Sequence, residues 1–212
     1  MKRSVEEMAA RFTEQAADYD EEKGAEYRAC AALVIEYADP DRDDVVLDLG
    51  TGTGAIALAL APDAERVIGR DISEGMLDRA RRKAADAGIE NVEFGYGEFR
   101  DPDVPTGRAV DVVTSNFALH HLDDDEKRAA IRVMAGTGAR RIVLGDVMFF
   151  EGPDPDEPFY NPDVDDPSTV GTLVEAFTDV GFAVVVAERV HDQVGVLVAE
   201  RIGSGDEVPG AE

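Results

Sequence analysis

The sequence predicts a doubly wound α/β fold in a single domain, and three observations support this class. Short apolar segments rich in valine, isoleucine and leucine alternate with segments of helical periodicity, a pattern typical of a parallel sheet covered by helices. The first apolar segment leads directly into a glycine-rich turn and a helix. The length of 212 residues suits one domain with a sizeable core. We expect this domain to span residues 1–202, with cap helices in 1–39, a core in 40–202 and a disordered acidic tail in 203–212.

Two helices are expected ahead of the core. In residues 4–17 the apolar side chains recur at helical spacing, and Ser4 with Glu7 forms a predicted capping box. A second helix is predicted over residues 25–38. Pro40 follows its end, as expected because the residue before a proline avoids the helical conformation.

The unit around which the other elements are arranged is the segment 45–55. Residues 45–49 are predicted to form a buried parallel strand, and a helical pattern begins at Ala55. The turn between them contains three glycines, Gly50, Gly52 and Gly54. Glycine is needed where the backbone turns sharply or approaches a ligand closely. A turn without a ligand is disfavoured, because three glycines at this spacing weaken packing and add nothing to a plain turn.

Two cofactor classes fit this glycine turn. With Ala55 in the last place, the segment satisfies G-x-G-x-x-A, the fingerprint of dinucleotide-binding proteins. With Asp48 in front, it has the form D-x-G-x-G-x-G, which resembles motif I of the class I S-adenosylmethionine-dependent methyltransferases. The motif alone does not decide between the two cofactors.

Asp71 ends the second predicted strand, residues 66–71, and lies 21 residues after Gly50. A carboxylate at this place can accept hydrogen bonds from both ribose hydroxyls of an adenosine. The alternative role, capping the next helix, suits Ser73 better. Arg70 would suit the extra phosphate of NADP, but strand alternation turns it to the opposite face from Asp71.

The remaining elements continue the alternation of strands and helices. We expect helices over residues 74–87, 126–135 and 168–180, strands over 110–116, 182–190 and 195–202, a strand with its exit loop over 91–99, and a fifth strand within 140–150. The fifth strand is predicted to end at Asp146, and Ser168 to cap the last helix. Residues 151–167 form a loop rich in Pro and Asp, which fits either a substrate lid or a solvated excursion.

The deciding segment runs from Asp111 to Leu122, DVVTSNFALHHL. It closely resembles the segment after strand four of the class I methyltransferases, and the resemblance as a whole covers roughly residues 10–202. A nicotinamide reductase would be expected to carry a Tyr-x-x-x-Lys pair after the fourth strand, and none follows this segment. Base-methylating relatives would carry Asn/Asp-Pro-Pro-Tyr/Phe where this chain has Asn116 followed by Phe, Ala and Leu.

This resemblance implies a Rossmann-like, seven-stranded sheet in the order 3-2-1-4-5-7-6 with one antiparallel strand. It implies S-adenosyl-L-methionine as cofactor, bound across the carboxyl ends of the strands. The cofactor-binding residues that it implies are Asp48, Gly50, Gly52, Gly54, Asp71, Ile72, Met76, Glu98, Phe99 and Asn116. Glu98 fits an acceptor for the adenine amino group, or one of the many surface acids. Tyr19 is the tyrosine of a Phe…Ala…Tyr-Asp lead-in that resembles the one capping the cofactor in such enzymes, or it packs half-buried.

His120 and Tyr19 are the candidate catalytic residues. Histidine titrates near neutral pH, so His120 could act as a general base, whereas His121 is expected to pack and orient its loop. Only three histidines are present, and no HxxxH or CxxC set accompanies them, so no metal site is expected.

The chain is strongly acidic, with 46 Asp and Glu against 21 Lys and Arg and a formal net charge of -25. Acids spread along the whole chain disfavour nucleic acid and anionic membranes as partners. They are typical either of a halophilic protein or of an ordinary acidic one. Cys30 is the only cysteine, no long apolar run exists, and the N-terminus lacks a signal-peptide core, so we expect a cytoplasmic protein.

We therefore expect a methyltransferase that transfers the methyl group directly, in line, to a small-molecule acceptor. The acceptor is expected to be neutral or cationic, with an amine, thiol or hydroxyl. Two alternatives stay open at this point: an NAD(P)-dependent oxidoreductase, and a non-catalytic cofactor-binding protein. The oligomeric state is not predicted.

Overall fold

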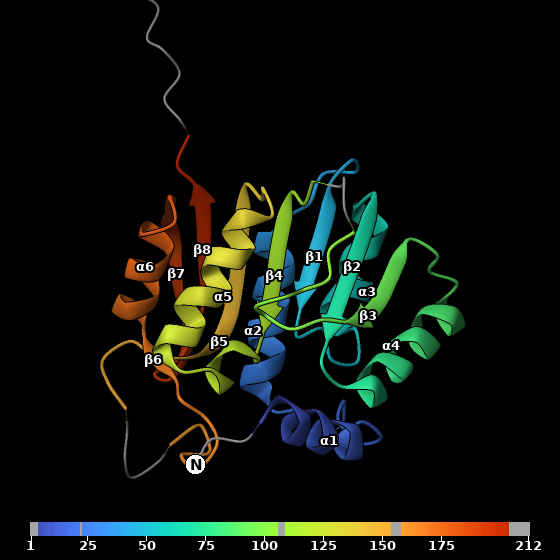
Figure 1. Ribbon diagram of the computed structural model, residues 1–212, viewed down its shortest axis with the longest axis horizontal. Helices are drawn as coiled ribbons and strands as arrows, with labels where there is room; N and C mark the ends of the chain where they lie inside the picture. Colours follow the sequence, from blue (N-terminus) through green and yellow to red (C-terminus); the bar gives the residue numbers. More distant parts are fainter. Residues whose placement is uncertain (1–3, 22, 106–108, 154–157, 204–212) are drawn as a thin grey trace, which may run out of the picture.

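The computed structural model describes residues 4–21, 23–105, 109–153 and 158–203, and these contain an eight-stranded sheet (Figure 1). The strands follow the order β3-β2-β1-β4-β5-β8-β7, and β6 pairs with β5 outside this path. Their bounds are β1 Val45–Leu49, β2 Arg66–Asp71, β3 Val92–Tyr96, β4 Val112–Asn116, β5 Arg141–Phe149, β6 Ser168–Thr169, β7 Phe182–His191 and β8 Val194–Arg201.

The predicted strand order is confirmed. Strands β3, β2, β1, β4 and β5 pair in parallel, whereas β8 is antiparallel to both of its neighbours, β5 and β7. The eighth strand is β6, a two-residue segment that pairs with Met148 and Phe149 of β5. It shifts the numbering of the last two strands by one and leaves the predicted topology unchanged.

Six α-helices and two short 3-10 helices lie in the described part of the chain. Their bounds are α1 Val5–Gln15, α2 Ala25–Ala38, α3 Ala55–Leu60, η1 Ala61–Asp63, α4 Glu74–Ala87, η2 Leu119–His121, α5 Asp124–Gly136 and α6 Val170–Thr178. Local capping sets several of these starts: Ser4 and Glu7 form the predicted capping box of α1, and Ser73 caps α4.

Two predicted helix starts are wrong, and side-chain hydrogen bonds explain both. Helix α5 begins two residues earlier than predicted, because Asp123 and Glu126 form a capping box ahead of it. Thr169, and not Ser168, caps α6. Ser168 belongs to β6, and its hydroxyl donates a hydrogen bond to Asp124 instead.

The sheet separates two apolar layers. On one face, α2 and α3 bury Cys30, Val34 and Leu60 against the valines of the central strands. On the other face, α5 and α6 contribute Met134 and Phe177 to the larger cluster. Burying a side chain such as Phe177 stabilises the fold by roughly 1.5–3 kcal/mol. Strand β1 is buried on both faces, as its continuous apolar sequence predicts.

Helix α1 lies apart from both layers. It has no buried residue, and it packs along α4 beneath the carboxyl ends of the parallel strands (Figure 1). Helix α2, by contrast, packs on the sheet, chiefly against β5, β4 and β8. Of the two helices expected to form a cap, only α1 is therefore placed to cover a ligand site.

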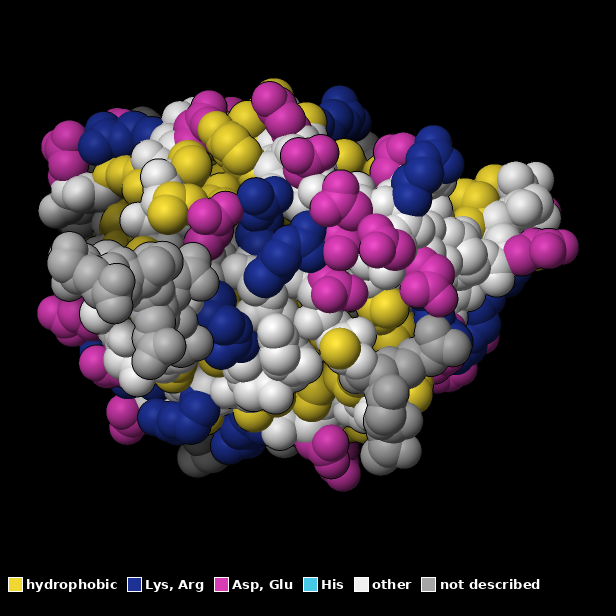
Figure 2. Space-filling model, turned by 90° about the horizontal axis from the view of Figure 1, so that it is seen from above, with side chains coloured by type: hydrophobic (Ala, Val, Ile, Leu, Met, Phe, Trp, Pro, Cys, Tyr) yellow, Lys and Arg dark blue, Asp and Glu magenta, His cyan; other side chains and the backbone are white. Residues whose placement is uncertain are grey.

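Charged side chains cover the outside of the molecule. Figure 2 looks onto the end opposite α1, where Asp and Glu side chains lie among Lys and Arg. Several cations are paired across elements: Arg128 of α5 lies 3.3 Å from both Glu175 and Asp179, and Arg140 lies 2.8 Å from Asp44. No helix in the described residues is both long and apolar enough to cross a membrane.

Strand β5 is longer than the predicted end at Asp146 suggests. It continues to Phe149, so Asp146 lies inside the strand with its side chain 3% exposed. Pairing with β8 and β6 on either side of its end extends the strand past this charged residue. The tail that we predict to be disordered lies, from residue 204 onward, outside the described residues.

Candidate active site

Asp48 stabilises the glycine turn that follows β1. Its carboxylate accepts hydrogen bonds from the hydroxyls of Thr51, at 2.6 Å, and Thr114, at 2.7 Å. Complete burial raises the pKa of Asp48 to about 6, against the opposing effect of the two hydroxyl donors. Asp48 thus ties the turn to β4 and does not itself line the pocket.

The three glycines of the turn all have positive φ, but they are required for different reasons. A Cβ on Gly50 would lie 2.4 Å from the Ala118 Cβ, and one on Gly54 would lie 2.9 Å from the Phe94 Cζ. These two positions are glycine because protein atoms leave no room. A Cβ on Gly52 would meet only Tyr19, at 3.8 Å, so Gly52 alone faces open space in the pocket.

Asp71 lies beside this turn, and each of its two carboxylate oxygens already accepts one hydrogen bond. Its Oδ2 accepts the Gly52 N–H at 2.8 Å, and its Oδ1 accepts the Ser73 N–H at 2.8 Å. Burial raises the pKa of Asp71, and the backbone donors oppose that shift. Each oxygen can accept one further hydrogen bond, so the carboxylate can hold a pair of vicinal hydroxyls.

A pocket opens at the carboxyl ends of β1, β2 and β4, where the strand order reverses. Seven of the ten predicted cofactor residues line it: Gly50, Gly52, Asp71, Ile72, Met76, Glu98 and Phe99. Helix α1 forms the opposite wall with Val5, Met8 and Phe12. The pocket therefore joins the ends of the parallel strands to the apolar side chains of α1.

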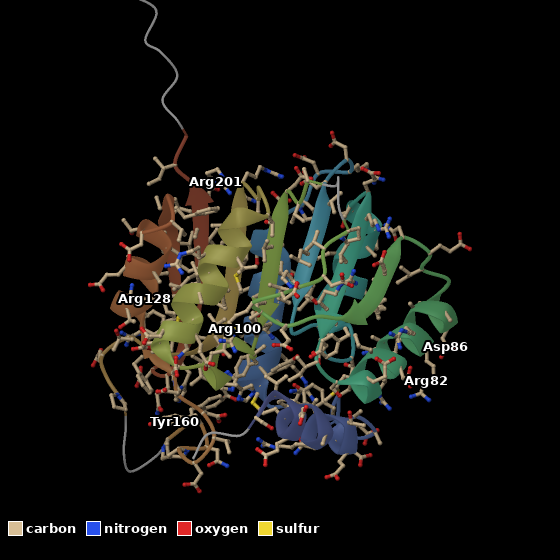
Figure 3. The ribbon with its side chains drawn as sticks, in the orientation of Figure 1. Arg82, Asp86, Arg100, Arg128, Tyr160 and Arg201 are labelled. Atoms are coloured by element: carbon tan, nitrogen blue, oxygen red, sulfur yellow. The ribbon has the colours of Figure 1, made fainter. Side chains whose placement is uncertain are left out.

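Charged residues near the pocket are mostly engaged with one another. Arg70 is buried and lies 2.7 Å from Glu93, so its side chain does not reach the pocket. Glu98 accepts a hydrogen bond from the Tyr96 hydroxyl at 2.8 Å. Arg100, labelled in Figure 3, lines the pocket and lies 3.7 Å from Glu126.

Tyr19 lines the pocket next to the glycine turn. The Lys23 ammonium lies 3.3 Å from the centroid of its ring. Burial, with the nearby Tyr27, Asp71 and Asp20, raises the pKa of Tyr19 above its usual value. The phenol is therefore protonated at neutral pH, which suits it to donate a hydrogen bond and not to act as a general base.

Asn116 and Phe117 end β4 at the centre of the site. The amide of Asn116 is buried beside the Tyr27 hydroxyl, yet its two polar atoms complete no hydrogen bond among the described residues. Phe117 follows with φ 53, a conformation that bulky residues rarely adopt. Such strain is typical of functional sites. Sequence reasoning missed it, because nothing in the composition of the segment signals a positive φ.

The two histidines of η2 occupy different places, and His121, which was expected to pack, is the one that lines the pocket. His120 is the packed one: its Nδ1 lies 2.5 Å from Asp146 Oδ1, and its backbone N–H donates to Asp146 Oδ2 at 3.0 Å. His121 lines the pocket, with its ring centroid 5.5 Å from that of Phe12.

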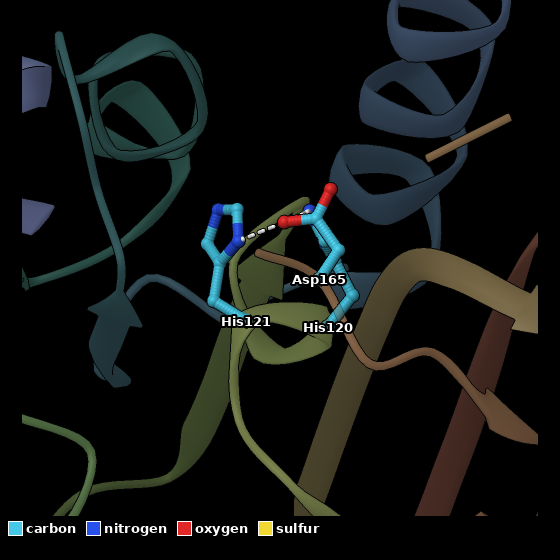
Figure 4. Close-up of side chains that lie close together, drawn as sticks. All are labelled: His120, His121 and Asp165. Carbon is cyan, nitrogen blue, oxygen red and sulfur yellow. Dashed lines mark hydrogen bonds and ion pairs between the residues drawn. The ribbon is translucent and has the colours of Figure 1, made fainter. Parts of the chain in front are cut away.

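Asp165 joins these histidines, although it lies 44 residues away in the sequence. Its Oδ1 is 2.7 Å from His121 Nδ1 and 4.0 Å from His120 Nε2 (Figure 4). The distance along the chain explains why spacing motifs in the sequence did not reveal this cluster.

Comparisons with known proteins agree on one family. The family described as "Methyltransferase domain" matches residues 46–137. The uncharacterized methyltransferase YcgJ of Bacillus subtilis is 33% identical over 148 residues, which are 69% of this chain and 57% of that protein. The chain thus spans less than two thirds of the length of this relative. An uncharacterized methyltransferase of Bacillus velezensis is 30% identical over 168 residues, covering 73% of this chain and 76% of the relative.

A solved structure supports the same fold. The chain superposes on the structure titled "DhpI-SAH complex" with a TM-score of 0.71 and 22% identity, over 93% of this chain and 97% of that one. By its title, that protein was solved with S-adenosylhomocysteine, the demethylated form of S-adenosylmethionine.

Proposed function

Because the chain belongs to the class I S-adenosylmethionine-dependent methyltransferases, we propose that it transfers the methyl group to a small neutral or cationic molecule. The enzyme class and the cofactor follow from the family, which sets aside the oxidoreductase and the non-catalytic alternatives. The observation that carries the acceptor class is the wall formed by α1, which covers the mouth of the pocket with Val5, Met8 and Phe12.

We assign the cofactor to the half of the pocket built by the ends of β1 and β2. The free lone pairs of Asp71 would accept the ribose hydroxyls, and Gly52 would let the ligand lie against the backbone. Ile72, Met76 and Phe99 would flank the adenine, with Glu98 at its edge. Tyr19 and Asn116 would supply polar groups toward the amino-acid end.

The protein would then contribute to catalysis in two ways: it aligns the acceptor with the methyl group, and it excludes water. S-adenosylmethionine, when bound, supplies a methyl group already activated by a sulfonium. Fixing an acceptor opposite that methyl group can contribute roughly 7–11 kcal/mol in favourable cases. The apolar wall of α1 and the ring of Phe117 would keep water away from the reacting atoms.

The surface charge supports a small, non-anionic acceptor. A formal net charge of -25 repels phosphate backbones and anionic lipids. The residues after Asn116 lack the prolines found in base-methylating relatives. A small neutral or cationic molecule is not repelled by this net charge.

Two measurements test the proposal. Calorimetric titration in molar KCl with S-adenosylhomocysteine, NAD and NADP should give binding of the first alone. Incubation with methyl-labelled S-adenosylmethionine and a metabolite extract, beside tRNA and genomic DNA, should place label in the small-molecule fraction. Label that appears in nucleic acid, and not among small molecules, would refute the acceptor class.

A further inference from the structure

We propose that His120, His121 and Asp165 bind one divalent transition-metal ion of the zinc or cobalt type at the wall of the pocket. This site departs from the expectation that the protein has no metal. The role given below to the ion in methyl transfer rests on the proposed function, whereas its binding does not.

The three side chains can each offer one ligand atom, and these atoms lie within 4.8 Å of one another. Two separations are 2.7 Å, between His121 Nδ1 and Asp165 Oδ1, and 4.0 Å, between His120 Nε2 and the same oxygen. Ligands of a tetrahedral Zn²⁺ at about 2.0–2.2 Å lie roughly 3.3 Å apart. Changes of about 0.6 and 0.7 Å would bring these two separations to that spacing, and the third pair of ligand atoms lies within 4.8 Å.

The residues behind these ligands already hold them in place. Asp146 binds His120 Nδ1, so Nε2 is the atom left to face the cluster. This is the carboxylate–histidine–metal arrangement that fixes the ring in metalloproteins. The Asn161 N–H donates to the second oxygen of Asp165 at 2.9 Å, and the Asp166 N–H donates to the His120 carbonyl at 2.8 Å.

A purely hydrogen-bonded cluster explains the geometry less well. His120 Nε2 is too far from Asp165, at 4.0 Å, for a hydrogen bond, although the His120 side chain is only 8% exposed. The Nε2 atom of this mostly buried side chain lies near a carboxylate oxygen without a hydrogen bond to it, a separation that leaves space for an ion between them. Two imidazoles and one carboxylate suit zinc or cobalt, whereas Mg²⁺ and Ca²⁺ prefer sets made of oxygens.

Three protein ligands leave a fourth position open, as in catalytic zinc sites. Because His121 lines the pocket, an ion held by its ring lies at the pocket wall. A hydroxyl or thiol bound there loses its proton more readily, and the proton passes to water. The freed oxygen or sulfur bonds to the methyl carbon, and the bond from that carbon to the sulfonium breaks with its electron pair remaining on sulfur. The site thus favours hydroxyl or thiol acceptors over amines.

The test uses the full chain, treated with a chelator and returned to molar KCl, which screens weak binding by surface acids. Titration with Co²⁺ should show one ion per chain with visible absorption bands, and calorimetry should show one Zn²⁺ displacing it. Asp165→Asn should weaken both by at least 100-fold, and Asp146→Asn by 10–100-fold. Asp163→Asn, which removes an exposed acid of the same loop, should leave binding unchanged.

Equal metal affinity of the wild type and Asp165→Asn would overturn the site. Methyl transfer by the metal-free wild type that is lost in metal-free His120→Gln would overturn the role of the ion in the reaction, because His120 would then act as a base. S-adenosylhomocysteine binding, measured on the same samples, should persist in Asp165→Asn. If the wild type binds metal but not S-adenosylhomocysteine, the proposed function fails and the metal site stands.

Discussion

The two halves of the pocket are built in different ways. The half that we assign to the cofactor (the cofactor half) comes from one continuous stretch, in which the ends of β1, β2 and β3 follow each other between Asp48 and Phe99. The half that we assign to the acceptor (the acceptor half) combines α1 with η2 and with the loop that carries Asp165. The first half depends on backbone conformation and a few carboxylates, and the second on side chains that meet only in the folded chain. Binding of the cofactor and choice of the acceptor should therefore be separable by mutation.

Removing salt should have the largest effect, because it acts on both halves at once. If the acidity is a halophilic adaptation, dilute buffer should abolish the whole stability of the fold, about 5–15 kcal/mol for an ordinary domain, and molar KCl should restore it. Circular dichroism melts across a KCl series measure this. A melting temperature that does not depend on salt would mark the protein as an ordinary acidic one.

Within the cofactor half, Gly52→Val should have the next largest effect. A branched side chain would enter the pocket and would sit at φ 53, so S-adenosylhomocysteine affinity should fall by at least about 1,000-fold, or roughly 4 kcal/mol. The fold should persist, as seen by circular dichroism. Gly50→Ala is the contrasting variant: its Cβ would collide with Ala118, so it should lower stability as well. Intact binding by Gly52→Val would remove this turn from the cofactor site.

Asp48 should make the stability of the cofactor half depend on pH. Its folded pKa of about 6 lies above the unfolded value near 3.9, so the ionised form is disfavoured in the fold. The resulting penalty is absent below about pH 4, grows as pH rises through 6, and approaches 3 kcal/mol above it.

The Asp48→Asn variant lacks the titrating carboxyl group, so it does not carry this penalty. Its unfolding free energy relative to the wild type should therefore rise between pH 4 and pH 7 at constant KCl, measured by urea denaturation. A difference that stays flat across this range would contradict the raised pKa.

Asp71→Ala should weaken binding of the cofactor without affecting the fold. Loss of hydrogen bonds to a charged group should reduce S-adenosylhomocysteine affinity by about 1.5–3 kcal/mol, measured by calorimetry. Asp78→Ala, on the exposed side of α4, serves as the control for loss of one acid. Unchanged affinity in Asp71→Ala would disprove the ribose assignment.

Phe12→Ala should affect the acceptor half and have the smallest effect on the cofactor. Its ring lies against His121, so turnover should fall about tenfold while S-adenosylhomocysteine affinity changes less than about threefold. Glu14→Ala, on the exposed side of the same helix, is the matched control. Equal losses in turnover and cofactor affinity would show that the two halves are not separable.

The cofactor half could be predicted from the sequence because its signals are local. The spacing from the glycine turn to Asp71 places both at the same edge of the sheet, and seven of the ten predicted residues line the pocket. The exceptions are also informative. Asp48 supports the turn through Thr51 and Thr114, and Gly54 is required because Phe94 leaves no room for a Cβ, so a motif match does not by itself mark a residue that contacts the ligand.

The acceptor half was predicted less well, because its contacts join distant segments. The sequence pattern could not show which of the two adjacent histidines turns toward the pocket, since Asp146 of β5 decides this by holding His120. It could not show that β5 continues past Asp146, because strand pairing with β6 and β8 extends it.

The sequence by itself determined the alternation of strands and helices, the glycine turn and the family, because each depends on residues close together in the chain. Only the tertiary structure decided that Asp165 meets His120 and His121, that Phe117 adopts a left-handed conformation, and that α1 covers the pocket. These features depend on packing between segments that the chain separates by tens of residues. Their free energy comes from the assembled fold, and no local pattern encodes it.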